Sequence, residues 1–199
     1  MEIRKLTEDE LVNYDNLVND SIEGTIFHKN WWLSIFKDYD DSYNVDFYGV
    51  FENGEMIAGM PIPIRSKFGF KLIYHPIMTR YLGPFYIQRN EKRYGKFTRE
   101  KKVNEELGKF LKRLNYLILH YTFNYNDLQP FQWNGFKIEV KYTYVLKLDN
   151  LEDVWKNMNR KRRNDINRCN SQNYYIKLSE IDKFIELNKR TKKKKKNII

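Results

Sequence analysis

The chain has 199 residues and a formal net charge of +10 at pH 7. This length is enough for one domain of ordinary size, or for one domain and part of another. A single cysteine, Cys169, excludes a disulfide within the chain. The sequence contains no signal peptide and no apolar run of about 20 residues, so we expect a cytoplasmic protein without a membrane span.

Positive charge is concentrated near the C-terminal end. Residues 151–199 contain 15 Lys and Arg against 6 Asp and Glu, whereas the first 150 residues contain 21 against 20. A nucleic-acid-binding fold usually carries a basic surface across the domain. The first 150 residues therefore do not fit that class of protein, and a contact with an anionic ligand is expected only from the C-terminal part.

The first part of the chain predicts a short strand followed by two helices. Residues 2–6 fit a strand, and Thr7 with Glu10 three residues later forms a capping box that begins a helix. Residues 21–24 end this helix. A second helix is predicted over residues 29–38, with an apolar side formed by Trp31, Trp32, Ile35 and Phe36.

Residues 45–75 predict three consecutive antiparallel strands. The β-rich segments 45–51 and 56–64 are joined by a turn that contains Asn53-Gly54. This dipeptide is a strong hairpin signal because both turn residues tolerate positive φ. A second turn at residues 67–69 leads into a third strand over 70–75.

The rest of the first 149 residues predicts a further helix and two more strands. Residues 79–86 form a short segment interrupted by Gly83-Pro84, and residues 89–98 are polar and predict a surface loop. The remaining predictions are an amphipathic helix over 99–114, a central strand over 116–123, a short helix over 127–133 and a long strand over 138–146. Together these elements predict an α+β fold with a largely antiparallel sheet and helices on both faces.

The basic C-terminal part predicts a separate, helical segment. Asn150 caps a new helix, whose apolar stripe runs from Leu151 to Cys169 and passes through Arg162, so we expect Arg162 near a buried edge. A strand over 174–178 and a helix from 180 to 187 follow. This helix is expected to end in the lysine run, which leaves a disordered basic tail over about 190–199.

Four short motifs follow one another along the chain: Phe27-His28-x-x-Trp31-Trp32, Tyr81-Leu82-Gly83-Pro84, Pro130-Phe131-x-Trp133-x-Gly135-Phe136 and the arginine-rich Arg160–Cys169. Together with the element order, they resemble the Fem-like branch of the GNAT acyltransferase superfamily, which contains tandem-GNAT proteins related to peptidoglycan interpeptide-bridge enzymes. The resemblance implies a first GNAT-like domain over residues 1–149. It also implies an incomplete start of a second GNAT-like domain over 150–199, as in a truncated or frameshifted relative.

The resemblance implies an N-acyltransferase that moves an acetyl or aminoacyl group to an amine on a cell-wall precursor or sugar-like acceptor. The co-substrate would be acetyl-CoA or aminoacyl-tRNA, with no tightly bound cofactor. The glycine-rich loop that binds coenzyme A in the superfamily is absent, because residues 75–84 read HPIMTRYLGP. The first domain would therefore hold the acceptor, and the second domain would supply most of the donor site.

Four residues are candidates for substrate binding, and no catalytic or metal-binding residue is assigned. By resemblance, Lys37 and Tyr81 would contact the acceptor, and Arg162 and Arg163 would contact phosphate or tRNA. The alternative for the two arginines is a solvated helix face, and for Lys37 a solvated helix end. The three histidines, His28, His75 and His120, are too scattered in the sequence for metal-ligand spacing, and we expect them to be structural.

Two other functions stay open at this point. The basic C-terminal helix could make the chain a nucleic-acid-binding module for tRNA, with affinity that falls steeply with salt. Alternatively, the chain could be an inactive GNAT-like fragment, so whether it is an enzyme is undecided. Neither the identity of donor and acceptor nor the oligomeric state follows from the sequence.

Overall fold

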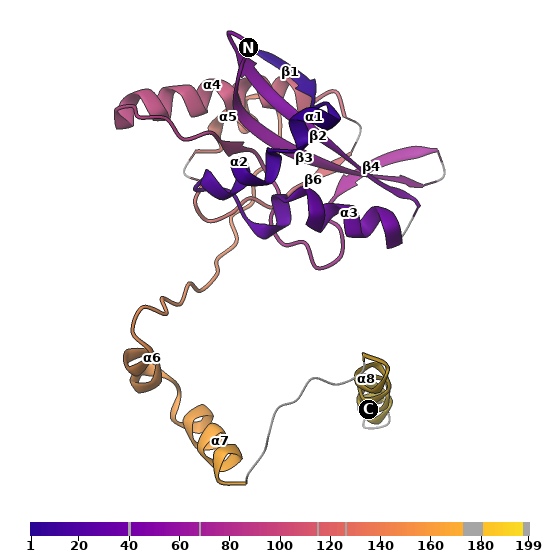
Figure 1. The fold of residues 1–199 in the computed structure, drawn as a ribbon, viewed down its shortest axis with the longest axis vertical. Coiled ribbons are helices and arrows are strands. Elements are labelled where there is room, and N and C mark those ends of the chain that lie inside the picture. Colours follow the sequence, from indigo (N-terminus) through magenta and orange to yellow (C-terminus); the bar gives the residue numbers. More distant parts are fainter. Residues whose placement is uncertain (40, 68, 115, 126, 173–180, 197–199) are drawn as a thin grey trace. The chain divides into compact units, whose positions relative to one another are not determined.

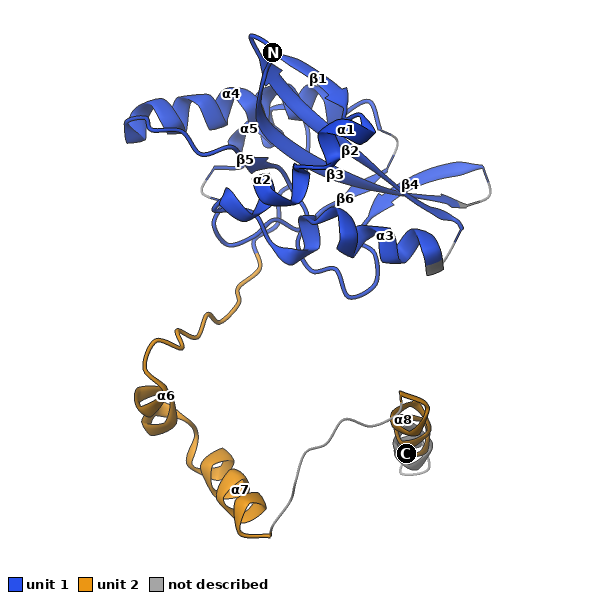
Figure 2. Cartoon of the chain, in the orientation of Figure 1, with its two compact units in different colours: residues 1–140 blue, residues 141–199 orange. Residues whose placement is uncertain are grey.

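The computed structural model describes residues 1–199 except 40, 68, 115, 126, 173–180 and 197–199. The chain divides into two compact units, Met1–Val140 and Lys141–Ile199 (Figure 2). The division lies after Val140, whereas the sequence placed the domain boundary after residue 149. The interpretation of the second unit as the start of a second GNAT-like domain stays a prediction.

A mixed sheet forms the centre of the first unit (Figure 1). Its described strands are β1 Glu2–Lys5, β2 Tyr43–Glu52, β3 Glu55–Lys67, β4 Phe70–Tyr74, β5 Phe85–Tyr86 and β6 Leu117–Ile118. They lie in the order β1-β2-β3-β4-β6, and β5 pairs with β3. Every described pair is antiparallel except β4 with β6, which run parallel. The site described below lies at this parallel pair.

Residues that tolerate positive φ form the turns of the two hairpins, as the sequence predicted. Asn53 and Gly54 have φ of 53° and 82°, and they join β2 to β3. Gly69 has φ of 80° in the next turn, which joins β3 to β4. Positive φ is accessible to glycine and tolerated by asparagine, so these positions fix where the strands reverse.

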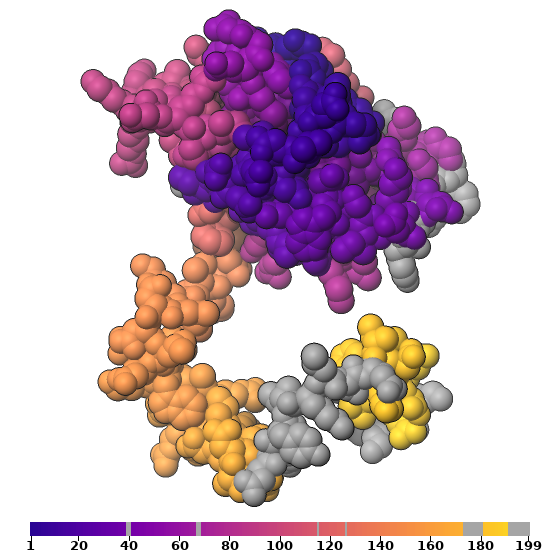
Figure 3. Space-filling model, in the orientation of Figure 1, coloured from indigo at the N-terminus to yellow at the C-terminus, as the bar shows by residue number. Residues whose placement is uncertain are grey.

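Helices cover both faces of the sheet (Figure 1). Figure 3 shows the near side of the first unit, where the N-terminal part of the chain, in indigo, lies at the surface. The helices are α1 Glu8–Leu11, α2 Tyr14–Asp20, the 3-10 helix η1 Ile26–His28, α3 Asn30–Tyr39, α4 Arg93–Leu111 and α5 Gln129–Trp133. One core cluster packs Val103, Leu107 and Leu111 of α4 against the sheet. The other packs Tyr14 of α2 and Leu33 of α3 against the opposite face. The predicted α+β class, with a largely antiparallel sheet and helices on both faces, is confirmed.

Two helices differ from their predicted form. In α3 the buried residues are Leu33 and Phe36, whereas Trp31 and Ile35 are about half exposed, so placing those two on the packed side was wrong. α4 begins at Arg93, inside the region predicted as a loop. This polar first half is stabilised because Arg99 is buried and donates to the Glu91 carboxylate at 2.6 Å.

Two predicted strands are also wrong. Residues 116–123 were expected to form a central strand, but only Leu117–Ile118 pair, and they lie at the end of the strand order. Past Ile118 the backbone of His120 bonds to a side chain and to a loop, which ends the ladder. Residues 138–146 form no strand, and Tyr142 is 95% exposed. Among the described residues, no strand pairs with this segment.

The second unit contains helices α6 Leu151–Asn157, α7 Arg160–Ser171 and α8 Ile181–Lys196. Asn150 caps α6 as predicted, because its side chain accepts from the N–H groups of Glu152 and Asp153. The single long helix that the sequence predicted is divided at Met158–Asn159. No residue of α6 or α7 is buried, and the Arg162 side chain is 74% exposed, so its expected position near a buried edge is wrong.

Two further expectations concern the end of the chain. The sequence predicted that the last helix would end in the lysine run. Instead, the backbone of α8 is helical through this run to Lys196. The strand predicted over 174–178 lies outside the described residues. Within the described part of the chain, no helix is long and apolar enough to cross a membrane.

Packing of α4 on the sheet predicts a large effect of truncation at its centre. Leu107 is fully buried, so Leu107→Ala removes contacts that the core cannot replace, and the free energy of unfolding should fall by about 2–5 kcal/mol. Urea unfolding followed by circular dichroism measures this change. Lys102→Ala, an exposed position on the same helix, is the control and should change stability by less than about 0.5 kcal/mol. Equal effects of the two substitutions would contradict the described packing.

Candidate functional site

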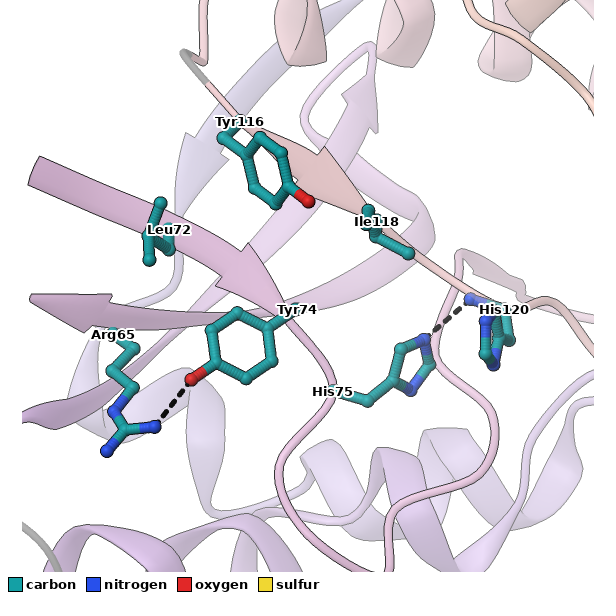
Figure 4. A pocket seen from close by; sticks show the side chains of 7 residues that line it. All are labelled: Arg65, Leu72, Tyr74, His75, Tyr116, Ile118 and His120. Atoms are coloured by element: carbon teal, nitrogen blue, oxygen red, sulfur yellow. Dashed lines mark hydrogen bonds between the residues drawn. The ribbon is translucent and has the colours of Figure 1, made fainter.

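An open hollow of about 550 Å³ lies on one face of the sheet, over the parallel strands β4 and β6 (Figure 4). Its lining residues are Arg65, Leu72, Tyr74, His75, Tyr116, Ile118 and His120. Alternate residues of a strand point to the same face. Leu72 and Tyr74 of β4 therefore lie beside Tyr116, which precedes β6, and Ile118 on β6, and the four side chains give the hollow an apolar and aromatic floor.

A guanidinium group with a fixed orientation lies at one end of the hollow. Arg65 on β3 donates from Nη1 to the Tyr74 hydroxyl at 2.7 Å and from Nε to Ser42 Oγ at 3.2 Å (Figure 4). Its carbon Cζ also lies 5.1 Å from the centre of the Tyr43 ring. These contacts hold a positive charge beside an otherwise apolar surface.

Two histidines lie at the other end, just past the carboxyl ends of β4 and β6. The backbone N–H of His120 donates to His75 Nε2 at 2.6 Å, and the ring centroids are 4.8 Å apart (Figure 4). Since Nε2 accepts this bond, the neutral imidazole of His75 has its proton on Nδ1. Burial, and then the nearby His120, lower the pKa of His75 to about 4. His75 is therefore neutral at pH 7, and its basic nitrogen is already engaged.

The carbonyl of His120 is engaged as well. It accepts from the backbone N–H of Leu82 at 2.8 Å, so the loop after β4 returns to lie along the end of β6. Gly83 permits this approach, because a Cβ there would lie 2.5 Å from the Tyr121 ring. In open sheets, ligands commonly bind outside the carboxyl ends of neighbouring parallel strands. Here the protein's own His75 and Leu82 occupy that position.

An aromatic cluster attaches the same loop to α3. The indole N–H of Trp32 donates to Thr79 Oγ1 at 3.1 Å. The Phe27 ring lies 5.5 Å from Trp32 and 6.2 Å from Tyr81, measured between centroids. Tyr81 is half-buried, and its hydroxyl accepts from Arg80 Nε at 3.2 Å. Tyr81 therefore lies beside η1 and the beginning of α3.

The four predicted substrate-binding residues do not line the hollow. Lys37 is exposed in the last turn of α3, while Tyr81 contacts Phe27 in η1, before that helix begins. Arg162 and Arg163 belong to α7 in the second unit. Arg162 lies 3.6 Å from Asp165 on the same helix. These positions do not test substrate binding, which stays a prediction for all four residues.

Arg163 closes the turn between two helices. Its guanidinium donates to the backbone carbonyls of Trp155 at 3.3 Å and Lys156 at 2.6 Å. Both carbonyls lie in the last turn of α6, where helix carbonyls have no partner within the helix. The contact gives Arg163 a structural purpose that the sequence did not indicate.

Most residues around the hollow were missed from the sequence. The alternation of Leu72 with Tyr74, and of Tyr116 with Ile118, was visible, but their adjacency depends on a parallel pairing across more than 40 residues of chain. His75 and His120 also meet only through this pairing. Among the described residues, no group of three or more His, Cys, Asp or Glu side chains could hold a metal ion.

His28 is buried and hydrogen-bonded within the fold, where a structural histidine is expected to lie. Its Nδ1 accepts from the backbone N–H of Thr25 at 3.2 Å, and the ring is almost fully buried under Phe85. Burial lowers the pKa of His28 to about 4, although hydrogen bonds with Gly83 and Thr25 act in the opposite direction. The side chain therefore joins η1 to the Gly83 loop as a neutral group.

No protein-family model matches the sequence, and no curated protein matches it. Three solved structures are similar over 75% of this chain. The first is an aminoglycoside 6'-N-acetyltransferase from Acinetobacter haemolyticus, with 16% sequence identity, 100% of its chain covered and a TM-score of 0.35. The second is a possible acetyltransferase from Clostridium difficile 630, with 12% identity, 98% of its chain covered and a TM-score of 0.37. The third is a glucosamine-6-phosphate N-acetyltransferase from Arabidopsis thaliana, with 17% identity, 98% of its chain covered and a TM-score of 0.35. Scores and identities this low assign neither fold nor activity to the chain.

Buried neutral histidines predict a loss of stability in mild acid. The folded-state pKa of His28 is about 4, against 6.5 in the unfolded chain, so the unfolded state binds a proton first as the pH falls. The stabilising contribution is complete above pH 6.5 and decreases toward pH 4, by about 2 kcal/mol between pH 8 and pH 5. His75 should add a change in the same direction.

Urea unfolding at pH 8, 6.5 and 5 measures this dependence. His28→Asn keeps a hydrogen-bonding side chain but does not titrate, so its stability should fall less over the same range than that of the wild type. A free energy of unfolding that is equal at pH 8 and pH 5 in the wild type would contradict the described burial.

Proposed function

We propose that Met1–Val140 is the acceptor-binding unit of a GNAT-type N-acyltransferase of the Fem-like kind. The reaction would transfer an acetyl or aminoacyl group to an amine on a cell-wall precursor or sugar-like acceptor in the cytoplasm. The observation that carries this proposal is the bridge at His120. Since the chain's own groups engage both backbone groups of His120, the gap between the parallel strands is closed to an acyl donor.

The order of elements supports the GNAT type. A strand, a helical region and three antiparallel strands are followed by a helix and a parallel strand, which are β1, α1 to α3, β2, β3, β4, α4 and β6. The first predicted helix corresponds to α1 and α2, and the second predicted helix, over 29–38, corresponds to α3. The short elements η1 and β5 lie within this order.

N-acyl transfer needs an amine held against the carbonyl carbon of an ester or thioester. The amine attacks, the bond to the leaving oxygen or sulfur breaks, and the amine proton passes to base or solvent. Such enzymes depend on positioning and on stabilising the developing oxyanion. In this proposal the first unit contributes positioning alone: the hollow supplies an apolar floor with the Arg65 guanidinium at one end.

The candidate contact residues have separate functions in this proposal. Lys37 and Tyr81 contact the acceptor on the α3 side of the first unit. Arg162 contacts an anionic group of the donor or acceptor, since its side chain is 74% exposed on α7. Arg163 would have to leave the α6 carbonyls to bind a ligand, so its contribution to affinity should be smaller.

A second candidate function is tRNA binding by α7. The observation in its favour is that Arg160, Lys161, Arg162 and Arg168 are all exposed on this helix. Arginine and lysine side chains contact phosphate without reading sequence, and such contacts weaken steeply with salt. The two functions coincide if the acyl donor is an aminoacyl-tRNA.

Ligand-dependent melting of the full chain tests both candidates. A ligand that binds only the folded state adds about 2.7 kcal/mol of stability at 100 times its Kd. We expect a UDP-linked peptidoglycan precursor to raise the Tm and acetyl-CoA to leave it unchanged. Lys37→Ala and Tyr81→Phe should each reduce the shift, whereas the control Lys102→Ala should preserve it.

The other outcomes separate the alternatives. Stabilisation by acetyl-CoA would show that the first unit holds the donor and would contradict the proposal. A shift with bulk tRNA alone, lost at higher salt and on neutralising Arg160 and Arg162, would favour the second candidate. No shift with any of the three ligands would leave an inactive fragment.

A further inference from the structure

The first unit carries a local concentration of positive charge that its total charge conceals. Residues 89–102 contain seven Lys and Arg against two Asp and Glu, a net charge of +5. The rest of the first 150 residues, with 14 basic and 18 acidic side chains, carries −4. The basic segment includes the first half of α4, and one end of this helix extends past the sheet (Figure 1). Its charge attracts an anionic ligand to this end of the helix.

Most of this charge is not neutralised within the protein. The two carboxylates of the segment, Glu91 and Glu100, are already paired with neighbouring cations at 2.6 and 3.6 Å. Within the described ranges of the chain, no carboxylate forms an ion pair with Lys92, Arg93 or Lys101. These three side chains therefore present positive charge that no described acidic group balances.

Exposed aromatic rings lie among these cations. Tyr94 and Phe97 of α4 are 81% and 45% exposed, and Trp133 of α5 is 59% exposed. Lys101 connects the two helices, because its Nζ lies 4.7 Å from the centre of the Trp133 ring and 5.9 Å from that of Phe97. Positions i, i+3 and i+7 share one side of a helix, so Tyr94, Phe97 and Lys101 follow one line along α4. We call Tyr94, Phe97 and Trp133 the aromatic row.

Core packing does not account for the aromatic row. The buried residues of α4 begin at Arg99, so no residue from Arg93 to Thr98 is buried. Single exposed aromatic side chains are common on protein surfaces and need no explanation. Here, however, three rings from two helices gather around one lysine, and Trp133 joins them only through the fold, because it is more than 30 residues away in the sequence.

We infer that the aromatic row and the cations beside it bind an unpaired stretch of nucleic acid. Single strands are bound where aromatic rings stack on successive bases and cations contact the phosphates. An acidic peptide would engage the cations but would leave the rings unused. A duplex keeps its bases stacked inside, so it would leave the rings unused as well. The inference does not depend on the proposed acyl transfer, and its surface is separate from α7.

Fluorescence anisotropy of a labelled oligouridylate of about 12 nucleotides, titrated with the full chain at physiological salt, tests the inference. Tyr94→Ala and Trp133→Leu should each weaken binding by at least about fivefold in Kd, because each removes one stacking surface. Phe70→Ala is the control, since it removes a ring that is 67% exposed at the start of β4, and it should leave the Kd unchanged. Circular dichroism checks that each variant is folded.

A matched pair of lysines separates this surface from non-specific charge. Lys101 and Lys102 are neighbours on α4, but neighbouring positions of a helix point about 100° apart, and only Lys101 lies over the rings. Lys101→Ala should therefore weaken single-strand binding clearly more than Lys102→Ala, although both remove one positive charge. The aromatic variants should leave the affinity for a duplex of equal length unchanged.

Photocrosslinking locates the contact in the wild type. An oligouridylate that contains 4-thiouridine, irradiated in complex with the full chain, should label peptides that contain Tyr94, Phe97 or Trp133, as read by mass spectrometry. The inference is overturned if the single strand does not bind, or if both aromatic variants bind it as the wild type does. It is also overturned if Lys101→Ala and Lys102→Ala have equal effects, or if every crosslink maps to residues 160–196.

Discussion

The arrangement around the candidate site depends on two hydrogen bonds, which the backbone N–H and C=O of His120 make with the His75 side chain and with the loop after β4. The imidazole of His75 accepts a hydrogen bond from the N–H of His120, and the N–H of Leu82 donates one to the carbonyl of His120. These two bonds connect the ends of the two parallel strands and bring the loop after β4 back across the sheet. The aromatic cluster of Phe27, Trp32 and Tyr81 then attaches that loop to α3.

This constraint decides which surface is available to a ligand. In open sheets, ligands commonly bind outside the carboxyl ends of neighbouring parallel strands. In this chain His75 and Leu82 hydrogen-bond to the backbone of His120 just past the strand ends, while the sheet face above β4 and β6 stays open. The hollow there joins an apolar floor to one fixed guanidinium. The acceptor-binding role that we propose rests on this surface.

Local features of the fold could be predicted from the sequence. The hairpin at Asn53-Gly54, the capping box at Thr7 and the cap at Asn150 depend on residues within a few positions of one another, and the structure contains all three. Features that depend on distant residues could not be predicted. The pattern of residues 116–123 indicates burial on both sides, but it does not say that His75 and Leu82 end the strand after Ile118. Likewise, the alternation of residues 138–146 describes a strand that needs a partner and does not identify one.

The residues of the candidate site also differ in whether the sequence could predict them. Tyr81 was predicted from a contiguous motif, but it lies beside Phe27 of η1 and does not line the hollow. Arg65 on β3, Tyr74 on β4 and Tyr116 just before β6 come together only in the folded chain, so no spacing in the sequence could group them. Arg162 was misplaced because an apolar stripe predicts burial only where a core exists to receive it, and α7 has none among its described neighbours.

Nitrogen-15 NMR of His75 and His120 tests whether the bridge at His120 forms and excludes an acyl donor. We expect a neutral His75 imidazole with its proton on Nδ1 at pH 6 and 7, and backbone amide signals of His120 and Leu82 that do not move when acetyl-CoA is added in excess. Specific shifts of both amides with acetyl-CoA, or a His75 proton on Nε2, would contradict it. The first result would mean that a donor displaces the bridge, and the second that the bridge does not form.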